Sequence, residues 1–229
     1  MKAGIITIGD ELIQGFTIDK NASLIAGALY NYGVTVCRHT SIGDVGSEIK
    51  RVLDEFILDE YPLIFITGGL GPTHDDITKL SLLEYFETDY KFDKGHFNNL
   101  NRKSFKKDNE LNSTLKSQAE ILECSNKIDN KYGMALGMYI EFSKSDIFIM
   151  PGVPFEMKKM FENEIIPKII LKFKLIKNNW TTIRTTGIYE SKLYSMLSHF
   201  IEEYIDKYKV SFLPHYFGVD LRITVVDQK

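Results

Sequence analysis

The sequence is poor in cysteine, has little net charge and lacks a long apolar segment. Two cysteines in 229 residues cannot form a network of several disulfides, so we expect a protein of the reducing cytoplasm. The net charge of −3 gives no general attraction to nucleic acid or to an anionic membrane. No apolar run approaches the roughly 20 residues that span a bilayer, and the first apolar segment ends at Gly9, too early for a signal peptide. Nucleic-acid and membrane partners are therefore not expected.

Two widespread phosphate-binding motifs are also missing. The glycine cluster at residues 68–71 is not followed by a lysine, as the Walker A pattern requires. Its spacing does not match the dinucleotide-binding pattern G-x-G-x-x-G either. The sequence therefore predicts neither a P-loop nucleotidase nor a standard dinucleotide-binding domain.

The sequence does contain an alternation of strand-like and helix-like segments. Apolar strands alternate with helices whose apolar residues recur at helical spacing, which predicts an α/β fold with a mostly parallel sheet. A polar, basic stretch at residues 172–179 predicts a boundary between a larger domain, residues 1–172, and a small α+β domain, residues 180–229. The expected strands are residues 3–8, 34–41, 63–67, 138–142, 146–150, 181–186, 209–213 and 219–226; the expected helices lie between 19 and 33 and at 45–59, 77–86, 111–122, 155–161, 164–173 and 192–208.

Residues 91–112 form a polar, basic segment of a different kind. Lysines and an arginine are interleaved there with Phe92, Phe97 and Phe105. This pattern occurs in surfaces that bind single-stranded nucleic acid, and also where solvated lysines cover packed phenylalanines. We favour a helical surface insertion, and a lid over bound phosphates is an intermediate interpretation.

The most informative stretch is residues 63–78, in which an apolar run meets a glycine cluster and then an acidic segment. The glycines at positions 68, 69 and 71 have no Cβ, so their backbone N–H groups can approach a ligand closely. If a helix begins near Asp75 or Asp76, its N-terminal N–H groups also favour an anion. Two aspartates beside a phosphate require a bridging cation such as Mg²⁺, or else they accept hydrogen bonds from ribose hydroxyls. The alternative is a tight turn with an aspartate as the helix cap.

Acidic and amide side chains also follow the first two expected strands. Asp10 and Glu11 follow one strand and Asp44 follows the other, at the edge where open α/β sheets bind ligands. The alternative is that Asp10 caps a helix or turn and Glu11 is merely exposed. Asp19 or Asn21 is the expected N-cap of the next helix, and either one is an alternative ligand contact.

Together these motifs resemble the CinA family, competence/damage-inducible protein A, whose N-terminal half is similar to molybdopterin-binding proteins of the MoaB/MogA type. The resemblance covers nearly the whole chain. Its most specific part is the segment 67–73 with residues 75–78, and further matches are residues 8–12 with Gly15, Asp19 and Asn21, then Gln118-Ala119, Asn130, Gly133, Gly137 and residues 151–157. Residues 186–188, 190–191, 213–214 and 221–224 resemble the KH-like linker domain of that family.

The resemblance implies both a fold and an activity. It implies a three-layer α/β domain of the MoaB/MogA type, a small KH-like domain and a homo-oligomer, dimer or trimer. It also implies metal-dependent hydrolysis of the pyrophosphate of ADP-ribose or a similar dinucleotide, with Mg²⁺ or another divalent cation; K⁺ is possible. Leu136 stands where the family usually has Pro, Met134 where it has Thr, and Tyr189 where it has Gly. The nicotinamide-nucleotide amidase domain that most members carry is not found in this sequence, so that activity is not expected.

The expected site combines the glycine loop with the acidic side chains. Asp75 or Asp76 with Glu11 is expected to bind the metal, with Asp76 and Glu11 as the first choice, and these three residues are the expected catalytic groups. Asp10 or Asp44 is expected to bind ribose hydroxyls or to orient water. Replacing Asp76 by alanine is expected to abolish turnover with little change in thermal unfolding. The expected substrate-binding residues are Asp10, Asn21, Asp44, Thr67, Gly68, Gly69, Leu70, Gly71, Thr73, Thr78, Pro151 and Gly152.

Two other functions stay open on this sequence. A nucleotidyl transferase that acts on molybdopterin would use the same glycine loop, because molybdopterin and ADP-ribose both present a phosphate. A binding module without chemistry is the third hypothesis, and Leu136 together with the missing partner domain favours it.

Overall fold

The computed structural model describes residues 1–103 and 109–226. The chain divides into two compact units, Met1–Leu175 and Ile176–Lys229. This division falls within the polar segment 172–179, where the sequence predicts a domain boundary. Each unit has a sheet and a hydrophobic core of its own.

The first unit is built on a six-stranded sheet in the order β2-β1-β3-β8-β7-β6. Its four parallel strands are β1 (Lys2–Ile8), β2 (Thr35–Ile42), β3 (Leu63–Thr67) and β8 (Ser145–Met150). Strands β7 (Gly137–Phe142) and β6 (Asn126–Ile128) continue the sheet with antiparallel pairing, and β7 and β8 form a hairpin. The predicted mostly parallel α/β sheet is confirmed.

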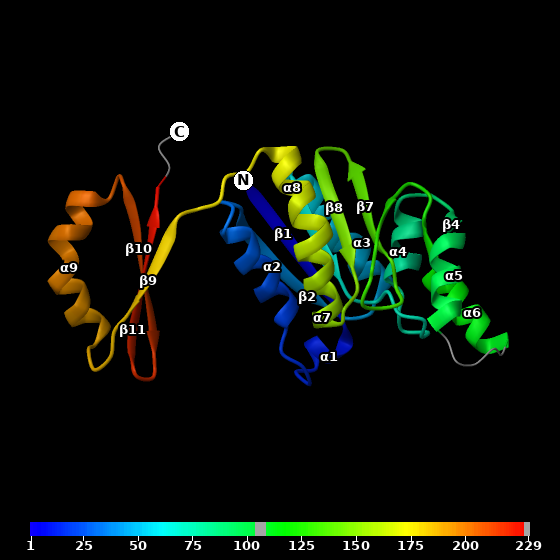
Figure 1. The fold of residues 1–229 in the computed structure, drawn as a ribbon, viewed down its shortest axis with the longest axis horizontal. Helices are drawn as coiled ribbons and strands as arrows, with labels where there is room; N and C mark the ends of the chain where they lie inside the picture. The colour runs from blue at the N-terminus through cyan, green and yellow to red at the C-terminus, as the bar shows by residue number, and fades with distance from the viewer. Residues whose placement is uncertain (104–108, 227–229) are drawn as a thin grey trace. The chain divides into compact units, whose positions relative to one another are not determined.

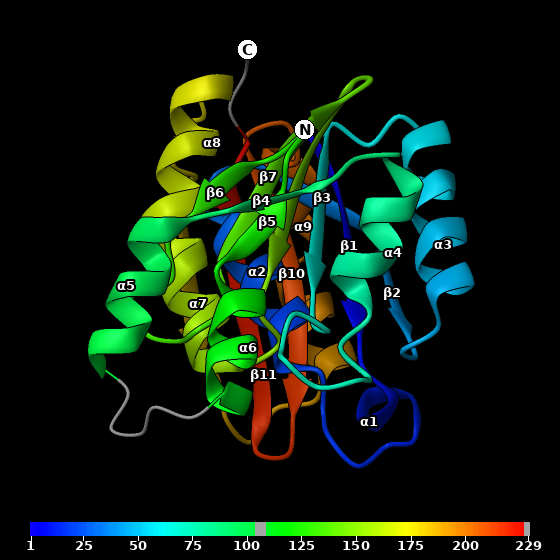
Figure 2. The ribbon, with the colours of Figure 1, turned by 90° about the vertical axis from the view of Figure 1, so that its right-hand side faces the viewer.

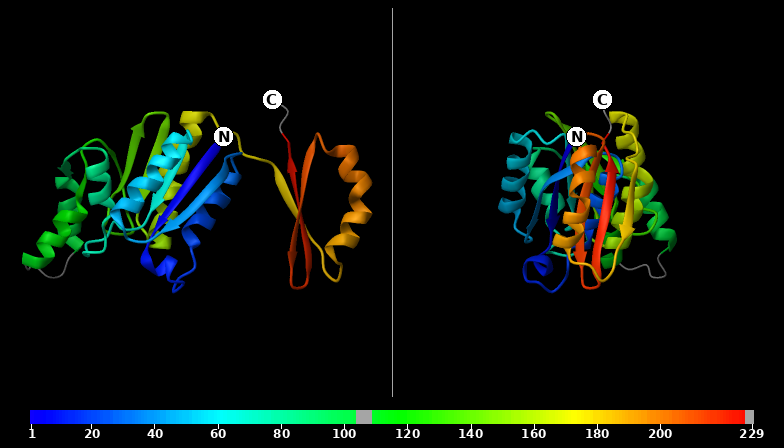
Figure 3. Two further views of the ribbon diagram at one scale, coloured as in Figure 1. Left: turned by 180° about the vertical axis from the view of Figure 1, so that it is seen from behind. Right: turned by 90° about the vertical axis from the view of Figure 1, so that its left-hand side faces the viewer.

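Helices cover both faces of this sheet, which gives three layers (Figures 1 and 2). Helices α2 (Lys20–Tyr30), α7 (Pro154–Met160) and α8 (Ile166–Phe173) pack on one face, and α3 (Gly46–Leu58) and α4 (Thr78–Tyr85) on the other. The view from behind in Figure 3 shows α3 in front of the sheet. In α3 the buried residues Ile49, Val52, Leu53 and Phe56 recur at helical spacing, which explains why one side of the helix faces the core.

The last helical segment of the first unit is continuous. The sequence predicts separate helices at 155–161 and 164–173, whereas α7 and α8 are joined by a π-helical turn, Phe161–Ile165. Pro167 at the start of α8 has no backbone N–H to donate, so the regular hydrogen-bond ladder cannot run through it. The π-helical turn accommodates Pro167, so the helix continues past the proline.

The basic segment forms an insertion of strands and helices. It contains β4 (Tyr90–Phe92), α5 (Lys94–Lys103), α6 (Asn109–Gln118) and β5 (Glu120–Leu122), and β4 pairs with β5. The rings of Phe92 and Phe97 pack at 5.4 Å, and Phe105 lies outside the described residues. The expected helix 111–122 is too long, because residues 120–122 pair with β4 instead. A helical surface insertion is thus what the structure shows.

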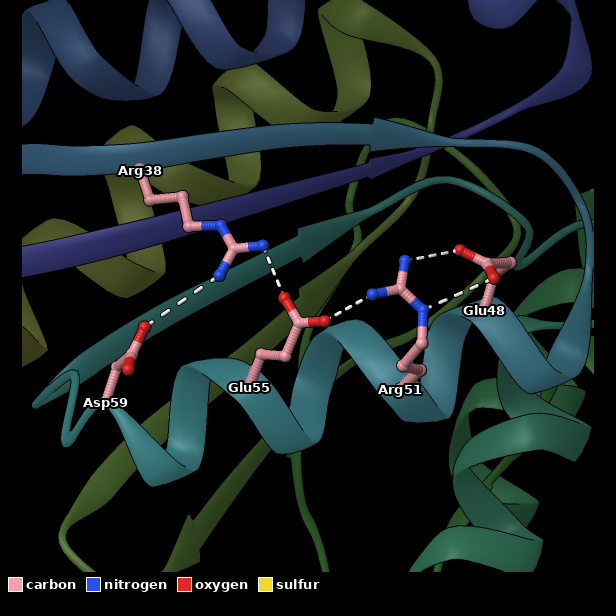
Figure 4. A network of polar contacts seen from close by, with 5 residues as sticks. All are labelled: Arg38, Glu48, Arg51, Glu55 and Asp59. Atoms are coloured by element: carbon pink, nitrogen blue, oxygen red, sulfur yellow. Dashed lines mark hydrogen bonds and ion pairs between the residues drawn. The ribbon is translucent and has the colours of Figure 1, made fainter.

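Side chains of opposite charge connect the edge strand β2 to α3 (Figure 4). Arg38 on β2 pairs with Glu55 and Asp59, and Arg51 pairs with Glu55 and Glu48 along the helix. Arg38 holds the pKa of Glu55 below its ordinary value, and Arg51 does the same for Glu48. Arg51 and Asp59 are exposed and the other three residues are half-buried, so water reaches the whole network and we assign it a role in orientation rather than a large part of the stability.

The second unit is a three-stranded antiparallel sheet covered by one helix. Its elements are β9 (Trp180–Arg184), α9 (Glu190–Tyr204), β10 (Tyr208–His215) and β11 (Gly218–Val225), with the strands in the order β10-β11-β9. Leu193 of α9 packs against Val219 and Leu221 of β11. Among the helices of both described units, none combines the length and the apolar character that crossing a bilayer requires.

Candidate functional site

A cavity of about 380 Å³ lies at the carboxyl ends of the parallel strands. Its wall includes Ile8 at the end of β1, Gly68 directly after β3 and Pro151 directly after β8, while Asp44 follows β2. We call it the acidic cavity. The expected site residues that line it are Glu11, Asp44, Gly68, Gly69, Leu70, Gly71, Asp75, Asp76, Pro151 and Gly152.

The glycine loop has a backbone that other residues adopt only with strain. Gly68 has φ of 114° and Gly69 has φ of 62°. A Cβ at Gly68 would lie 2.0 Å from the carbonyl oxygen of Ile8, and a Cβ at Gly69 would lie 2.2 Å from the Thr78 hydroxyl. The loop therefore needs glycine for its dihedral angles and for close packing against the end of β1.

Only part of the loop backbone is available to a ligand. The N–H of Gly68 donates to the carbonyl of Met150, and the N–H groups of Gly71 and Thr73 donate to Asp76. The N–H groups of Gly69 and Leu70 have no acceptor within the described part of the chain. Fewer backbone N–H groups of residues 68–73 are thus available to a ligand than the sequence predicts.

Asp76 holds the loop in shape. Its carboxylate accepts hydrogen bonds from the Gly71 N–H at 2.8 Å, the Thr73 N–H at 2.9 Å and the Thr73 hydroxyl at 2.5 Å. Helix α4 begins at Thr78, so neither Asp75 nor Asp76 starts the helix as expected. Three of the lone-pair positions of Asp76 are already used, which leaves it less free for a metal than the sequence suggests.

Asp76 therefore gives a prediction that differs from the sequence-based one. We expect Asp76→Ala to lower the free energy of unfolding by about 2 kcal/mol or more, because three donors around the loop lose their charged acceptor. Asp75→Asn is the matched control, since the Asp75 side chain is 65% exposed. It should leave the melting temperature within about 1 °C of the wild type. Equal melting temperatures for the two variants in a thermal scan would contradict the loop-holding role.

Asp10 and Asp44 bond each other's backbone. The Asp10 N–H donates to Asp44 at 2.9 Å, and the Asp44 N–H donates to Asp10 at 3.0 Å. This exchange joins the start of α1 (Asp10–Ile13) to the turn after β2, and Asp10 does not line the acidic cavity. Burial raises the pKa of Asp44, the hydrogen bond from the Asp10 N–H lowers it in part, and the carboxylates of Asp10, Glu11 and Asp76 raise it further.

The raised pKa of Asp44 gives a pH-dependent prediction. The folded protein holds the Asp44 proton more tightly than the unfolded chain does, so this contribution to stability falls as the pH rises from 3.8 through the raised pKa. Without divalent cations, Asp44→Asn should therefore raise the melting temperature at pH 7 by roughly 1–3 °C. At pH 4 the difference should shrink, and Mg²⁺ should stabilise the wild type more than the variant. A constant difference at both pH values would be evidence against this account.

Five carboxylates line the acidic cavity, and none of its described lining residues is a lysine or an arginine. They are Glu11, Asp44, Asp75, Asp76 and Glu156. Within residues 1–103 and 109–226, no three His, Cys, Asp or Glu side chains converge closely enough to hold a metal ion by themselves. Mg²⁺ commonly binds through one or two carboxylates and the phosphates of a substrate. The residues present fit a cation bound in that way.

Two lining residues with polar side chains, Gln118 and Glu156, were not among the expected site residues, although both belong to motifs that resemble the family. The Glu156 carboxylate accepts a hydrogen bond from Asn130 at 2.9 Å and lies in the first turn of α7. Gln118 is buried and donates to the carbonyl of Leu70 at 3.2 Å, and this hydrogen bond helps to hold the glycine loop in place. The signal for Glu156 is its place directly after the run 151–154.

Several other expected ligand contacts do not line the acidic cavity. The buried Thr78 hydroxyl donates to the Gly68 carbonyl at 2.9 Å, and the buried Thr67 hydroxyl donates to the Pro151 carbonyl at 2.8 Å. Thr73 is bound to Asp76, and Asn21 bridges Thr67 and Gly152. These hydrogen bonds position the loops after β3 and β8, while Asn21 Oδ1 has no partner among the described residues. The other expected N-cap, Asp19, does cap α2 through the Ala22 N–H.

The fold and the cavity define a three-layer α/β protein with an acidic, glycine-lined pocket at the carboxyl ends of its parallel strands. The family described as "Probable molybdopterin binding domain" matches residues 4–170. The chain therefore belongs to the family of probable molybdopterin-binding domains, and its relatives include CinA-like proteins.

Two relatives show how far the similarity extends. A protein of Pyrococcus horikoshii is 36% identical over 97% of this chain and 88% of its own length. A CinA-like protein of Chlorobium phaeobacteroides is 33% identical over 99% of this chain but only 54% of its own length. The chain thus spans about half the length of that CinA-like relative.

Two solved structures have a fold similar to that of this chain. A CinA protein of unknown function from Thermoplasma acidophilum superposes with a TM-score of 0.63 at 28% identity, covering 75% of this chain and 96% of the other. A molybdopterin biosynthesis protein from Mycobacterium abscessus superposes with a TM-score of 0.51 at 14% identity, covering 76% and 94% of the two chains. The second likeness shows a shared fold alone.

Proposed function

We propose that the acidic cavity binds the diphosphate of ADP-ribose or a similar dinucleotide together with a divalent cation, and hydrolyses the bond between the two phosphoryl groups. One observation supports this most strongly. The N–H groups of Gly69 and Leu70, which have no acceptor among the described residues, belong to the wall that also carries five carboxylates. Amides suit phosphate oxygens, while the carboxylates require a positive charge between themselves and the ligand.

The chain's own residues have separate roles in this reaction. The N–H groups of Gly69 and Leu70 bind one phosphoryl group, and Asp76 keeps the loop in the shape that presents them. Glu11 has no hydrogen-bond or ion-pair partner for its carboxylate among the described residues, so it is available to orient the attacking water. A divalent cation, when bound, supplies the charge that neutralises the phosphates. Water adds to one phosphorus and the bridging oxygen leaves with the other, giving AMP and ribose 5-phosphate.

A second candidate function is adenylyl transfer to molybdopterin. The family description names molybdopterin binding, and a phosphate of that ligand would use the same N–H groups. Asp75 suits either chemistry, because its own N–H, the Thr73 hydroxyl and His74 hold its pKa below the ordinary value and keep it ionised.

One experiment separates the candidates. The purified chain is incubated with Mg²⁺ and ADP-ribose, and in parallel with Mg²⁺, ATP and molybdopterin, and the products are separated by chromatography. We expect release of AMP and ribose 5-phosphate in the first reaction. An adenylylated pterin without AMP release from ADP-ribose would favour the second candidate. Tight binding of ADP-ribose without any product would leave a binding module.

A further inference from the structure

A half-buried lysine at the start of α4 connects the glycine loop to the insertion of residues 90–122. Lys79 is the second residue of α4, and its ammonium donates to the Ser117 carbonyl at 2.5 Å and to the Glu120 carbonyl at 3.4 Å. Burial lowers the pKa of Lys79, and the carboxylates of Glu120 and Asp76 raise it in part. The ammonium has exchanged water for two backbone carbonyls, so it ties the end of α6 to α4.

Gln118 lies between the two residues whose carbonyls Lys79 binds. Its side chain is 1% exposed, and its Nε2 donates to the Leu70 carbonyl at 3.2 Å. The carbonyl of the next residue, Ala119, accepts a hydrogen bond from the Asp93 N–H at 2.8 Å. The turn between α6 and β5 is therefore held at both ends, and its position decides where the Gln118 amide lies.

The first residue of α4 holds the same loop directly. The Thr78 hydroxyl donates to the Gly68 carbonyl at 2.9 Å, and the Thr78 N–H donates to the Gly69 carbonyl at 3.2 Å. A peptide group is planar, so these bonds orient the N–H groups of Gly69 and Leu70, which share planes with those carbonyls. Leu70 needs a further restraint on its other side.

Gln118 and Asp76 supply that restraint. The peptide group that joins Leu70 to Gly71 is held by Gln118 through its carbonyl and by Asp76 through its N–H. If the turn between α6 and β5 shifted, the Leu70 carbonyl would lose one of these two restraints and a buried acceptor would lose its donor.

We infer that Lys79 is a positioning residue for the phosphate site, because it holds the turn between α6 and β5 where Gln118 keeps Leu70 in place. This inference rests on the proposed function, in which the Leu70 N–H binds a phosphoryl group. Neither the ammonium nor any other part of Lys79 lines the acidic cavity, so Lys79 acts through Gln118 without touching the substrate. The insertion thereby becomes a support of the glycine loop.

The test replaces Lys79 by methionine, which keeps an unbranched apolar side chain but removes the ammonium. Isothermal titration calorimetry measures the Kd of α,β-methylene-ADP-ribose, which is not cleaved between its phosphorus atoms, on the full chain with Mg²⁺. A steady-state assay measures AMP release from ADP-ribose. We expect Lys79→Met to raise Kd and KM about tenfold, the size of one or two neutral hydrogen bonds, while kcat stays within about threefold. Lys79→Arg retains the charge and should restore both constants to within about threefold.

A purely structural lysine would give a different result. Its loss would lower the melting temperature and the folded fraction, but the folded molecules would keep the wild-type KM. Lys50→Met is the matched control, since the Lys50 ammonium pairs with Glu84 on the exposed side of α4. It should leave Kd and KM within about twofold of the wild type. A thermal melt shows whether each variant is folded at the assay temperature; if Lys79→Met is not, Lys79→Gln replaces it with the same expectation.

A double-mutant cycle tests whether Lys79 acts through Gln118. Gln118→Met should raise Kd about tenfold, and the double variant should not raise it further, whereas independent effects would multiply. If Lys79→Met binds the probe as the wild type does, or if the two effects multiply, the positioning role is wrong while the phosphate site stands. If the wild type neither binds the probe nor releases AMP, the proposed function itself fails.

Discussion

Replacing Glu11 by glutamine is expected to lower kcat/KM for AMP release from ADP-ribose by at least about a hundredfold. Glutamine has nearly the same shape but no negative charge, so it neither attracts a cation nor accepts a proton from water. The Glu11 side chain is exposed and its carboxylate has no hydrogen-bond or ion-pair partner among the described residues, so the substitution should not disturb the fold. The measurement is a steady-state assay of AMP at saturating Mg²⁺, with a thermal melt of the same preparation.

The control for this prediction is the melting temperature. Glu11→Gln should melt within about 1 °C of the wild type, in contrast to Asp76→Ala, which removes the support of the glycine loop. Retention of more than a tenth of the wild-type rate would show that Glu11 does not act in the reaction. A large drop in melting temperature would assign it a structural role instead.

Replacing Gly68 by alanine is expected to cost about 3 kcal/mol or more of unfolding free energy. The residue has φ of 114°, and the new Cβ would lie 2.0 Å from the backbone oxygen of Ile8, which cannot move without shifting β1. The measurement is urea unfolding followed by far-UV circular dichroism. The only tryptophan, Trp180, lies in the second unit, so its fluorescence would not report this change directly.

Gly27 provides the matched glycine. It lies within α2, its φ is not positive, and a Cβ there would meet nothing within 4 Å. Gly27→Ala should therefore stabilise the protein by about 0.5–1 kcal/mol, through a better helix propensity. If the two substitutions changed the unfolding free energy equally, the close packing of Gly68 would not be the cause of its effect.

Local patterns were sufficient for the main features of the first unit. The apolar run before Gly68 and the spacing of Ile49, Val52 and Phe56 predict a buried strand and an amphipathic helix, and the structure has both. The glycine cluster also predicts the loop. Gly68 and Gly69 both have positive φ, which glycine adopts without strain and other residues rarely adopt. Patterns at residues 111–122 were less informative, because the pairing of β5 with β4 depends on a segment about 30 residues away.

In the candidate site, too, local sequence predicts some properties of single side chains and not others. Glu11 and Asp44 were expected at the strand ends and Asp75 after the glycine loop, and all three line the acidic cavity. Thr67 and Thr78 have the same polar character in the sequence, yet their hydroxyls face backbone carbonyls and are buried. Composition and spacing do not distinguish a hydroxyl that binds a ligand from one that holds a loop.

The sequence by itself determined the alternation of strands and helices, the glycine loop and the acids at the strand ends, because these depend on residue type and on neighbours along the chain. Only the tertiary structure decided which polar atoms stay available. Asp76 is engaged by the loop N–H groups, Asp44 has a raised pKa because it is partly buried and lies near other carboxylates, and Asn21 keeps one acceptor unpaired among the described residues. Each of these properties depends on atoms from distant segments that meet only when the sheet has formed.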